Sequence, residues 1–102
     1  MNQGAVVEVA MFELKEGIAP KTFLAAAEEA TGWLRNRPGF LARELLADNG
    51  GKWIDLVRWA SLDDAHSAAD EFMSATETRA LLDAIDPATL RMLHPRSVAR
   101  YD

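Results

Sequence analysis

Two histidines are the side chains of this sequence best suited to proton transfer near neutral pH, and each also has a structural interpretation. His94 stands beside Pro95 in the predicted last strand and would suit proton abstraction from a phenol. The alternative is a histidine hydrogen-bonded at a strand end or in a subunit interface. His66 precedes Asp70 by four residues, which favours a surface pair, although Met73 nearby also suits a place at a pocket rim.

Arg58 and Trp59 close the third predicted strand and are candidates for contact with a substrate. Arg58 would stabilise a substrate oxyanion, or else form a structural ion pair across the sheet or a dimer interface. Trp59 offers a flat indole for stacking on an aromatic ring, or else it fills the core beneath the helices. We therefore take His94 and Arg58 as candidate catalytic residues, and Trp59 and His66 as candidate substrate-binding residues.

Asp55 is a charge within the same apolar strand, and a buried charge needs a partner. Alternation places it on the face of Trp59, opposite to Arg58. We expect a structural ion pair here. The charged residues available as partners for Asp55 and Arg58 are Glu8, Arg43, Arg96 and Arg100.

The composition excludes several kinds of site and partner. A formal net charge of −5 argues against nucleic acid as a partner, because such binding depends on Lys and Arg contacts to phosphate. The sequence has no cysteine, which excludes disulfides and thiolate metal sites. No ligand spacing ties the two histidines together, so we expect neither a metal nor another cofactor. Met1–Ala10 has no basic residue and does not resemble a signal peptide, and no apolar stretch is long enough to span a membrane, so we expect a cytoplasmic protein.

The elements that must position these side chains follow from periodicity and turn residues. Asn49-Gly50-Gly51 predicts a hairpin, and Ser61 with Asp64 predicts a capped helix start. The predicted strands are 5–14, 40–47, 52–60 and 92–101, with Pro95 inside the last one. The predicted helices are 20–36, one from Ser61 through Met73, and 77–85, with one more helical turn through Leu90.

The order β-α-β-β-α-α-β predicts one α+β domain over residues 1–102, of the ferredoxin-like type, with a four-stranded antiparallel sheet. The helix before the second strand and the broken helical segment after the third strand would both cover one face of that sheet. The first strand is apolar on both of its faces, so the other face of the sheet must also be covered. The chain is too small to cover it alone, and we therefore expect a homodimer.

Several segments of the sequence resemble the antibiotic biosynthesis monooxygenase-like family of the dimeric α+β barrel superfamily. They are Pro38-Gly39-Phe40, Arg43–Leu46, Trp53–Trp59 and Ser61 with Asp64-Ala65. The resemblance implies a homodimer of stacked sheets, with a pocket between sheet and helices in each subunit. Monooxygenases of that family oxidise polycyclic aromatic molecules without metal or flavin, and Trp59 matches a pocket tryptophan in them. Haem-degrading members use an asparagine, a tryptophan and a histidine where this chain has Ala10, Ala68 and Thr78, so we expect no haem.

Two functions stay open at this point. One is a cofactor-independent monooxygenase that acts on a small apolar or aromatic molecule, with His94 as base, Arg58 as oxyanion donor and Trp59 against the ring. The other is a non-catalytic dimer that binds a ligand or serves as an accessory or stress-associated protein. The two differ in where His94 and Arg58 point: the enzyme needs both in one cavity with Trp59.

Overall fold

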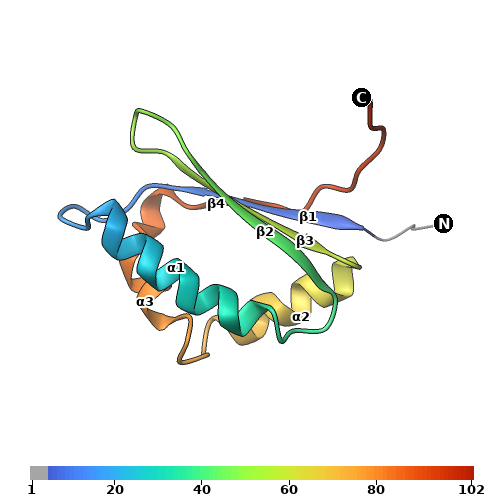
Figure 1. Ribbon diagram of the computed structural model, residues 1–102, viewed down its shortest axis with the longest axis horizontal. Helices are drawn as coiled ribbons and strands as arrows, with labels where there is room; N and C mark the ends of the chain where they lie inside the picture. Colours follow the sequence, from blue (N-terminus) through green and yellow to red (C-terminus); the bar gives the residue numbers. More distant parts are fainter. Residues whose placement is uncertain (1–4) are drawn as a thin grey trace.

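The elements follow each other in the predicted order β-α-β-β-α-α-β. The computed structural model describes residues 5–102, and in this range it has four strands and three α-helices (Figure 1). The strands are β1 (Val6–Phe12), β2 (Phe40–Ala47), β3 (Trp53–Trp59) and β4 (Arg91–Leu93). The helices are α1 (Pro20–Leu34), α2 (Leu62–Phe72) and α3 (Arg79–Ala84), and a short 3-10 helix, η1 (Pro87–Thr89), precedes β4.

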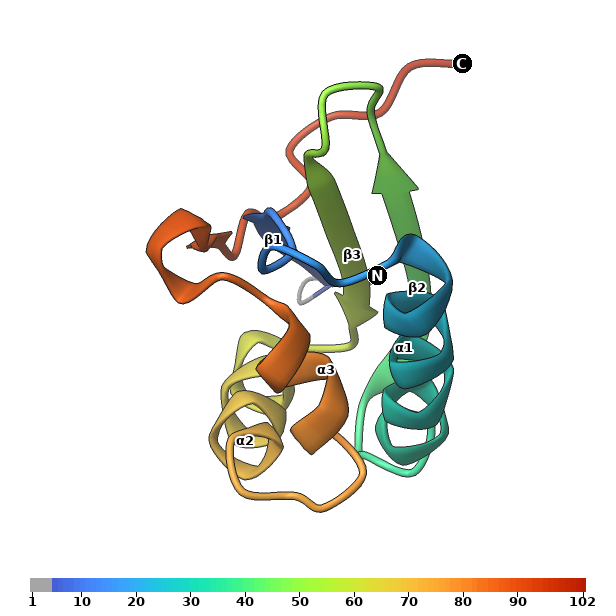
Figure 2. The same ribbon diagram turned by 90° about the vertical axis from the view of Figure 1, so that its left-hand side faces the viewer.

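The four strands form one antiparallel sheet in the order β2-β3-β1-β4. All three α-helices lie on the same side of this sheet, as the two views in Figures 1 and 2 agree. This arrangement confirms the predicted ferredoxin-like α+β fold. It divides the side chains of each strand into a set that faces the helices and a set on the outer face of the sheet.

Local sequence accounts for the boundaries of the elements that carry the site. Pro20 is the first residue of α1, where its missing N–H costs no hydrogen bond. The predicted cap of α2 is confirmed, because the Asp64 backbone N–H donates to Ser61 Oγ over 3.1 Å. In the β2–β3 turn, Gly51 has a φ of +88°, a conformation that side chains with a Cβ rarely adopt.

The last strand is much shorter than predicted. We expected a strand over 92–101, whereas β4 ends at Leu93. Pro95 has no N–H to donate to a ladder, so regular pairing stops before it. Contact with β1 continues only locally, because the Val7 N–H donates to the Pro95 carbonyl over 3.0 Å and Val6 bridges to Arg96.

The core lies between the helices and the sheet, in two clusters. The first joins β1 to α1 and α3, and its aromatic centre is Phe23, which contacts Phe12 and Trp53 at ring-centroid distances of 5.5 and 4.8 Å. The second packs Trp59 and Val57 of β3 against α1 and α2. Trp53 is therefore a packing residue of the first cluster.

None of the helices within residues 5–102 is long and apolar enough to cross a membrane. The first four residues of the segment Met1–Ala10, which we expect not to be a signal peptide, lie outside the described range.

Candidate functional site

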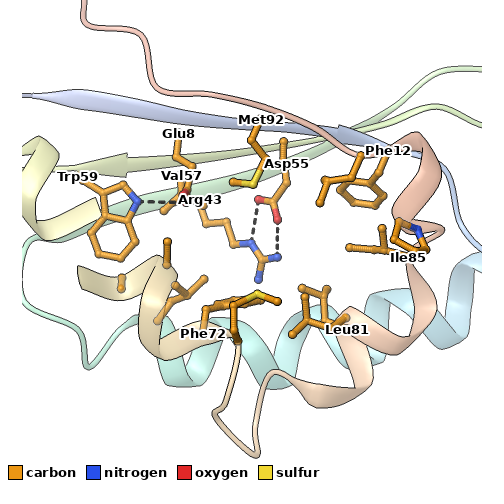
Figure 3. A pocket seen from close by; sticks show the side chains of 18 of the residues that line it. Glu8, Phe12, Arg43, Asp55, Val57, Trp59, Phe72, Leu81, Ile85 and Met92 are labelled. Atoms are coloured by element: carbon orange, nitrogen blue, oxygen red, sulfur yellow. Dashed lines mark hydrogen bonds and ion pairs between the residues drawn. The ribbon is translucent and has the colours of Figure 1, made fainter. Parts of the chain in front are cut away.

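A cavity of about 320 Å³ lies between the sheet and the helices, and its wall is mainly apolar (Figure 3). Helix-facing side chains of β1 and β3 line one side of it, and residues of α2, α3 and the segment before β4 line the other. The apolar and aromatic lining residues are Ala10, Phe12, Leu34, Val57, Trp59, Ala68, Ala69, Phe72, Met73, Leu81, Leu82, Ile85, Pro87, Leu90 and Met92. Four charged residues complete the lining: Glu8, Lys15, Arg43 and Asp55.

Arg43 and Asp55 form a buried ion pair in the middle of this cavity (Figure 3). Two parallel hydrogen bonds join them, from Arg43 Nε to Oδ1 over 3.0 Å and from Nη2 to Oδ2 over 2.6 Å. Arg43 Nη1 also donates to α1, to the Ala27 carbonyl and the Thr31 hydroxyl. Both oxygens of Asp55 are therefore occupied by a single guanidinium, a geometry that neutralises the carboxylate. Asp55 has the structural ion pair that the sequence predicted.

Glu8 of β1 is the second carboxylate of the cavity and lies beside Trp59 (Figure 3). The indole Nε1–H of Trp59 donates to Glu8 Oε1 over 3.4 Å, a long hydrogen bond. Trp59 itself is fully buried, and it packs edge to face on Phe40 at a centroid distance of 5.8 Å. Trp59 thus borders the cavity and has the core-filling position that was one of its two predicted roles, with no accessible ring face in this structure for stacking.

His94 lies behind Glu8, just after β4. Its Nε2 is 3.1 Å from Glu8 Oε2, while its side chain is 25% exposed. It is not among the residues that line the cavity. The structure therefore brings His94 to the site through Glu8, which separates it from the cavity.

His66 lies on α2 and is exposed, with its ring edge to face against His94 at a centroid distance of 5.3 Å. In the part of the chain that the structure describes, no ion pair joins it to Asp70, so the expected surface pair does not form. It packs on His94 instead. Like His94, it does not line the cavity.

Arg58 lies on the outer face of the sheet. In the antiparallel register it pairs with Val7 of β1, and alternation turns it away from Trp59 and the helices. It is exposed and lines a separate hollow with Pro95, Arg96 and Arg100. Within one subunit Arg58 is therefore out of reach of the cavity, and the arginine that the cavity does contain is Arg43.

The positions that carry haem chemistry in related proteins have other surroundings here. Ala10 and Ala68 line the cavity and offer no ligand atom. Thr78, just before α3, is buried, and its hydroxyl donates to the carbonyls of Phe72 at the end of α2 and of Ala75 in the loop between the two helices. Within residues 5–102, no three His, Asp or Glu side chains form a group suited to a metal ion.

Sequence reasoning did not select Glu8 or Arg43 as site residues. Both were noted only as partners for Asp55 or Arg58. The signal for Glu8 was its place on the β1 face shared with Phe12, since a charge on the face that helices cover lies in the core or in a cavity.

Comparisons with known proteins agree with this architecture. A family model described as "Antibiotic biosynthesis monooxygenase" matches residues 5–78. A mutant of SnoaB, a cofactor-independent oxygenase from Streptomyces nogalater, shares the fold at a TM-score of 0.78 and 17% identity, over 95% of this chain and 96% of its own. A candidate antibiotic biosynthesis monooxygenase from Bordetella bronchiseptica gives 0.76 and 16%, over 95% and 100%. Another from Caulobacter crescentus gives 0.70 and 17%, over 96% and 93%. No curated protein matches the sequence.

Proposed function

We propose that this chain, which belongs to the antibiotic biosynthesis monooxygenase family, forms a homodimer that oxidises a small apolar or aromatic molecule with dioxygen and without a resident cofactor. The observation that supports the proposal most is the cavity beneath the sheet. Its wall is mainly apolar, and Glu8 on that wall lies beside the indole of Trp59 and contacts His94, which lies outside the lining.

The size and lining of the cavity favour a compact aromatic ligand. Its volume of about 320 Å³ lies at the lower end of the roughly 300–1,000 Å³ that is usual for ligand pockets. Phe72 is a partly buried aromatic residue of its lining, and the fully buried indole of Trp59 lies at its wall. A molecule of two or three fused rings would fill such a space.

The chemistry needs only groups that the site and the substrate supply. A phenol or enol gives up a proton and becomes a carbanion-like anion, which passes an electron to dioxygen. When a methylene group becomes a carbonyl, one dioxygen is consumed and one water leaves, so no external reductant enters the balance. The protein would supply a base, a water-poor pocket and a surface that holds the ring.

Among the residues selected from the sequence, we propose different roles for the two catalytic candidates. His94 takes part in the acid–base pair with Glu8. Arg58 lies on the outer face, and its proposed role is an ion pair or hydrogen bond at the subunit interface. His66 supports His94 from the solvent side, and Trp59 contacts the ligand.

The outer face of the sheet supports the proposed dimer. No helix within residues 5–102 covers this face (Figure 1), and β1 and β3 place an apolar strip on it. Five of its residues are only partly buried in the single chain: Val7, Val9, Met11, Ile54 and Leu56. Burial of such a strip against a second copy is the usual reason for a small α+β chain to associate.

Anthrone is a suitable probe for the proposed activity, because its methylene group can become the carbonyl of anthraquinone. We expect the purified protein to accelerate anthraquinone formation over buffer, with one dioxygen consumed per product, after metals are removed with a chelator. Dioxygen uptake and mass spectrometry of the product measure this. Binding of anthrone without acceleration would contradict the oxygenase.

A second candidate function is that of a non-catalytic ligand-binding dimer. The position of Arg58 favours it, because the oxyanion donor expected from the sequence is absent from the cavity. In that case anthrone would bind with ordinary saturation and would be recovered unchanged.

A further inference from the structure

We infer that Glu8, and neither histidine, is the group that accepts the ligand's proton in this cavity, and that His94 positions Glu8 for that task. The inference rests on the proposed function, since it names the proton acceptor and the ligand class of the same site. The two carboxylates of the cavity, Asp55 and Glu8, have different hydrogen-bond partners.

Asp55 is not available as a base. Both of its oxygens accept hydrogen bonds from Arg43, at 3.0 and 2.6 Å, and the guanidinium cancels its charge. Arg43 in turn is held by α1 through the Ala27 carbonyl and Thr31. The pair is internally satisfied, so proton transfer to Asp55 would first have to break it.

Glu8 is held differently. Its partners are the indole N–H of Trp59 on Oε1 and the imidazole of His94 on Oε2, and in residues 5–102 no Arg or Lys pairs with it. Each carboxylate oxygen can accept two hydrogen bonds, so lone pairs remain for a ligand. The side chain lines the cavity and is only 13% exposed. The Trp59 indole and the His94 imidazole thus hold the Glu8 carboxylate at the wall, and among the described residues no permanently charged side chain pairs with it.

His94 acts on the ligand only through Glu8. When Glu8 is ionised, the carboxylate can only accept, so the imidazole nitrogen that faces it must be the one that carries hydrogen. The His66 ring packs edge to face with the His94 ring, which restricts the rotation of His94. His94 is therefore a positioning residue, because it orients Glu8 and lies outside the cavity lining.

The transfer itself is a single balanced step. An O–H bond of the ligand, or the C–H bond of its keto tautomer, breaks, and an O–H bond forms on Glu8. The electron pair stays on the ligand as an enolate or phenolate. The other charged groups that face this space are Arg43 with Asp55, and the exposed Lys15; His66 packs on His94 and is not part of the lining.

This arrangement predicts the class of ligand. A neutral molecule with an acidic O–H donates to Glu8, whereas a carboxylate of the same shape meets a like charge there. The site should therefore prefer phenols and enols to aromatic acids.

A pair of matched ligands, 2-naphthol and 2-naphthoate, tests the inference by calorimetric titration at neutral pH. We expect the native protein to bind 2-naphthol at least about tenfold more tightly than 2-naphthoate, the effect of one charge-assisted hydrogen bond. Glu8→Gln should lose this preference or reverse it. Glu16→Gln, a change at an exposed turn residue, should keep it. An unchanged preference in folded Glu8→Gln would overturn the inference.

Two further variants separate positioning from folding. Glu8→Asp retains the charge and should still discriminate against 2-naphthoate, even if it binds 2-naphthol more weakly. His94→Phe keeps the packing on His66 but loses the N–H, and it should shift the pH at which 2-naphthol binding is half-maximal. If His94→Phe leaves this pH profile unchanged, His94 does not position Glu8.

The outcomes also separate this inference from the proposed function. Preference for 2-naphthol that depends on Glu8, with no oxidation of anthrone, would support the proton acceptor and contradict the oxygenase. Oxidation of anthrone at the native rate by Glu8→Gln would support the oxygenase and contradict the role of Glu8.

Discussion

Replacement of Arg43 by methionine should strongly destabilise the protein, because it breaks a buried ion pair. The methionine keeps an unbranched stem but removes the guanidinium. Arg43 is 4% exposed and Asp55 11%, so the change leaves an ionised carboxylate out of water with no cation. It also removes two hydrogen bonds to α1. Removal of one partner of a buried ion pair costs about 3–5 kcal/mol.

That loss is large beside the total stability of a small domain, which is about 5–15 kcal/mol. Urea denaturation followed by tryptophan fluorescence measures it as a fall in the free energy of unfolding. All samples should have the same protein concentration, because association would make the stability depend on it.

A double-mutant cycle tests the reason for the loss. Arg43→Met with Asp55→Leu replaces the pair by apolar side chains, and this double variant should be more stable than Arg43→Met alone, because no charge is left unpaired. A cost below about 1 kcal/mol for Arg43→Met would match a solvent-exposed pair and refute the argument from burial. The argument would also be refuted if the free energy of unfolding lost by the double variant equalled the sum of the losses of the two single variants.

Four other predictions follow from the same structure. Trp59→Ala should lower the free energy of unfolding by about 3–5 kcal/mol, as measured by thermal melts; a stable variant with weakened anthrone binding would instead make Trp59 mainly a ligand contact. Sedimentation should show a dimer at micromolar concentration, and Leu56→Glu on the outer face should yield monomer; a native chain that stays monomeric would contradict the proposed dimer. Protein purified without added cofactor should contain no stoichiometric metal, haem or flavin by elemental analysis and absorbance, and a saturable Soret band at one haem per subunit would show that reasoning to be wrong. A hydrogen bond to Glu13 and the charge of Glu13 raise the pKa of Lys52 above 10.5. The small stabilisation from this exposed pair should therefore be present at neutral pH and be lost as the pH rises through that pKa. Above that pKa, Lys52→Met should have the same free energy of unfolding as the native protein.

Short-range features of the sequence determined where elements begin and end and which side chains share a face. Strand β2 has the predicted bounds 40–47, because glycine precedes it and the Asn49-Gly50-Gly51 turn follows it. The α2 cap at Ser61 formed as predicted, since capping depends on residues three apart. Period-two alternation correctly placed Asp55 and Trp59 on one face and Arg58 on the other. These properties depend on neighbours along the chain, which a single sequence contains in full.

The make-up of the site was decided by contacts between distant residues. Glu8 and His94 are 86 positions apart, and their contact depends on the place of β4 beside β1. The β2–β3 register selects the cation that pairs with Asp55. It sets Arg43 opposite Val57, diagonally next to Asp55. Strand β4 stopped early because Pro95 cannot donate to the ladder, and His94 therefore lies outside regular pairing, where its ring can turn to Glu8. Sequence alone determined which side chains face the helices, and only the tertiary structure decided which of those charges neutralise each other and which one remains for a ligand.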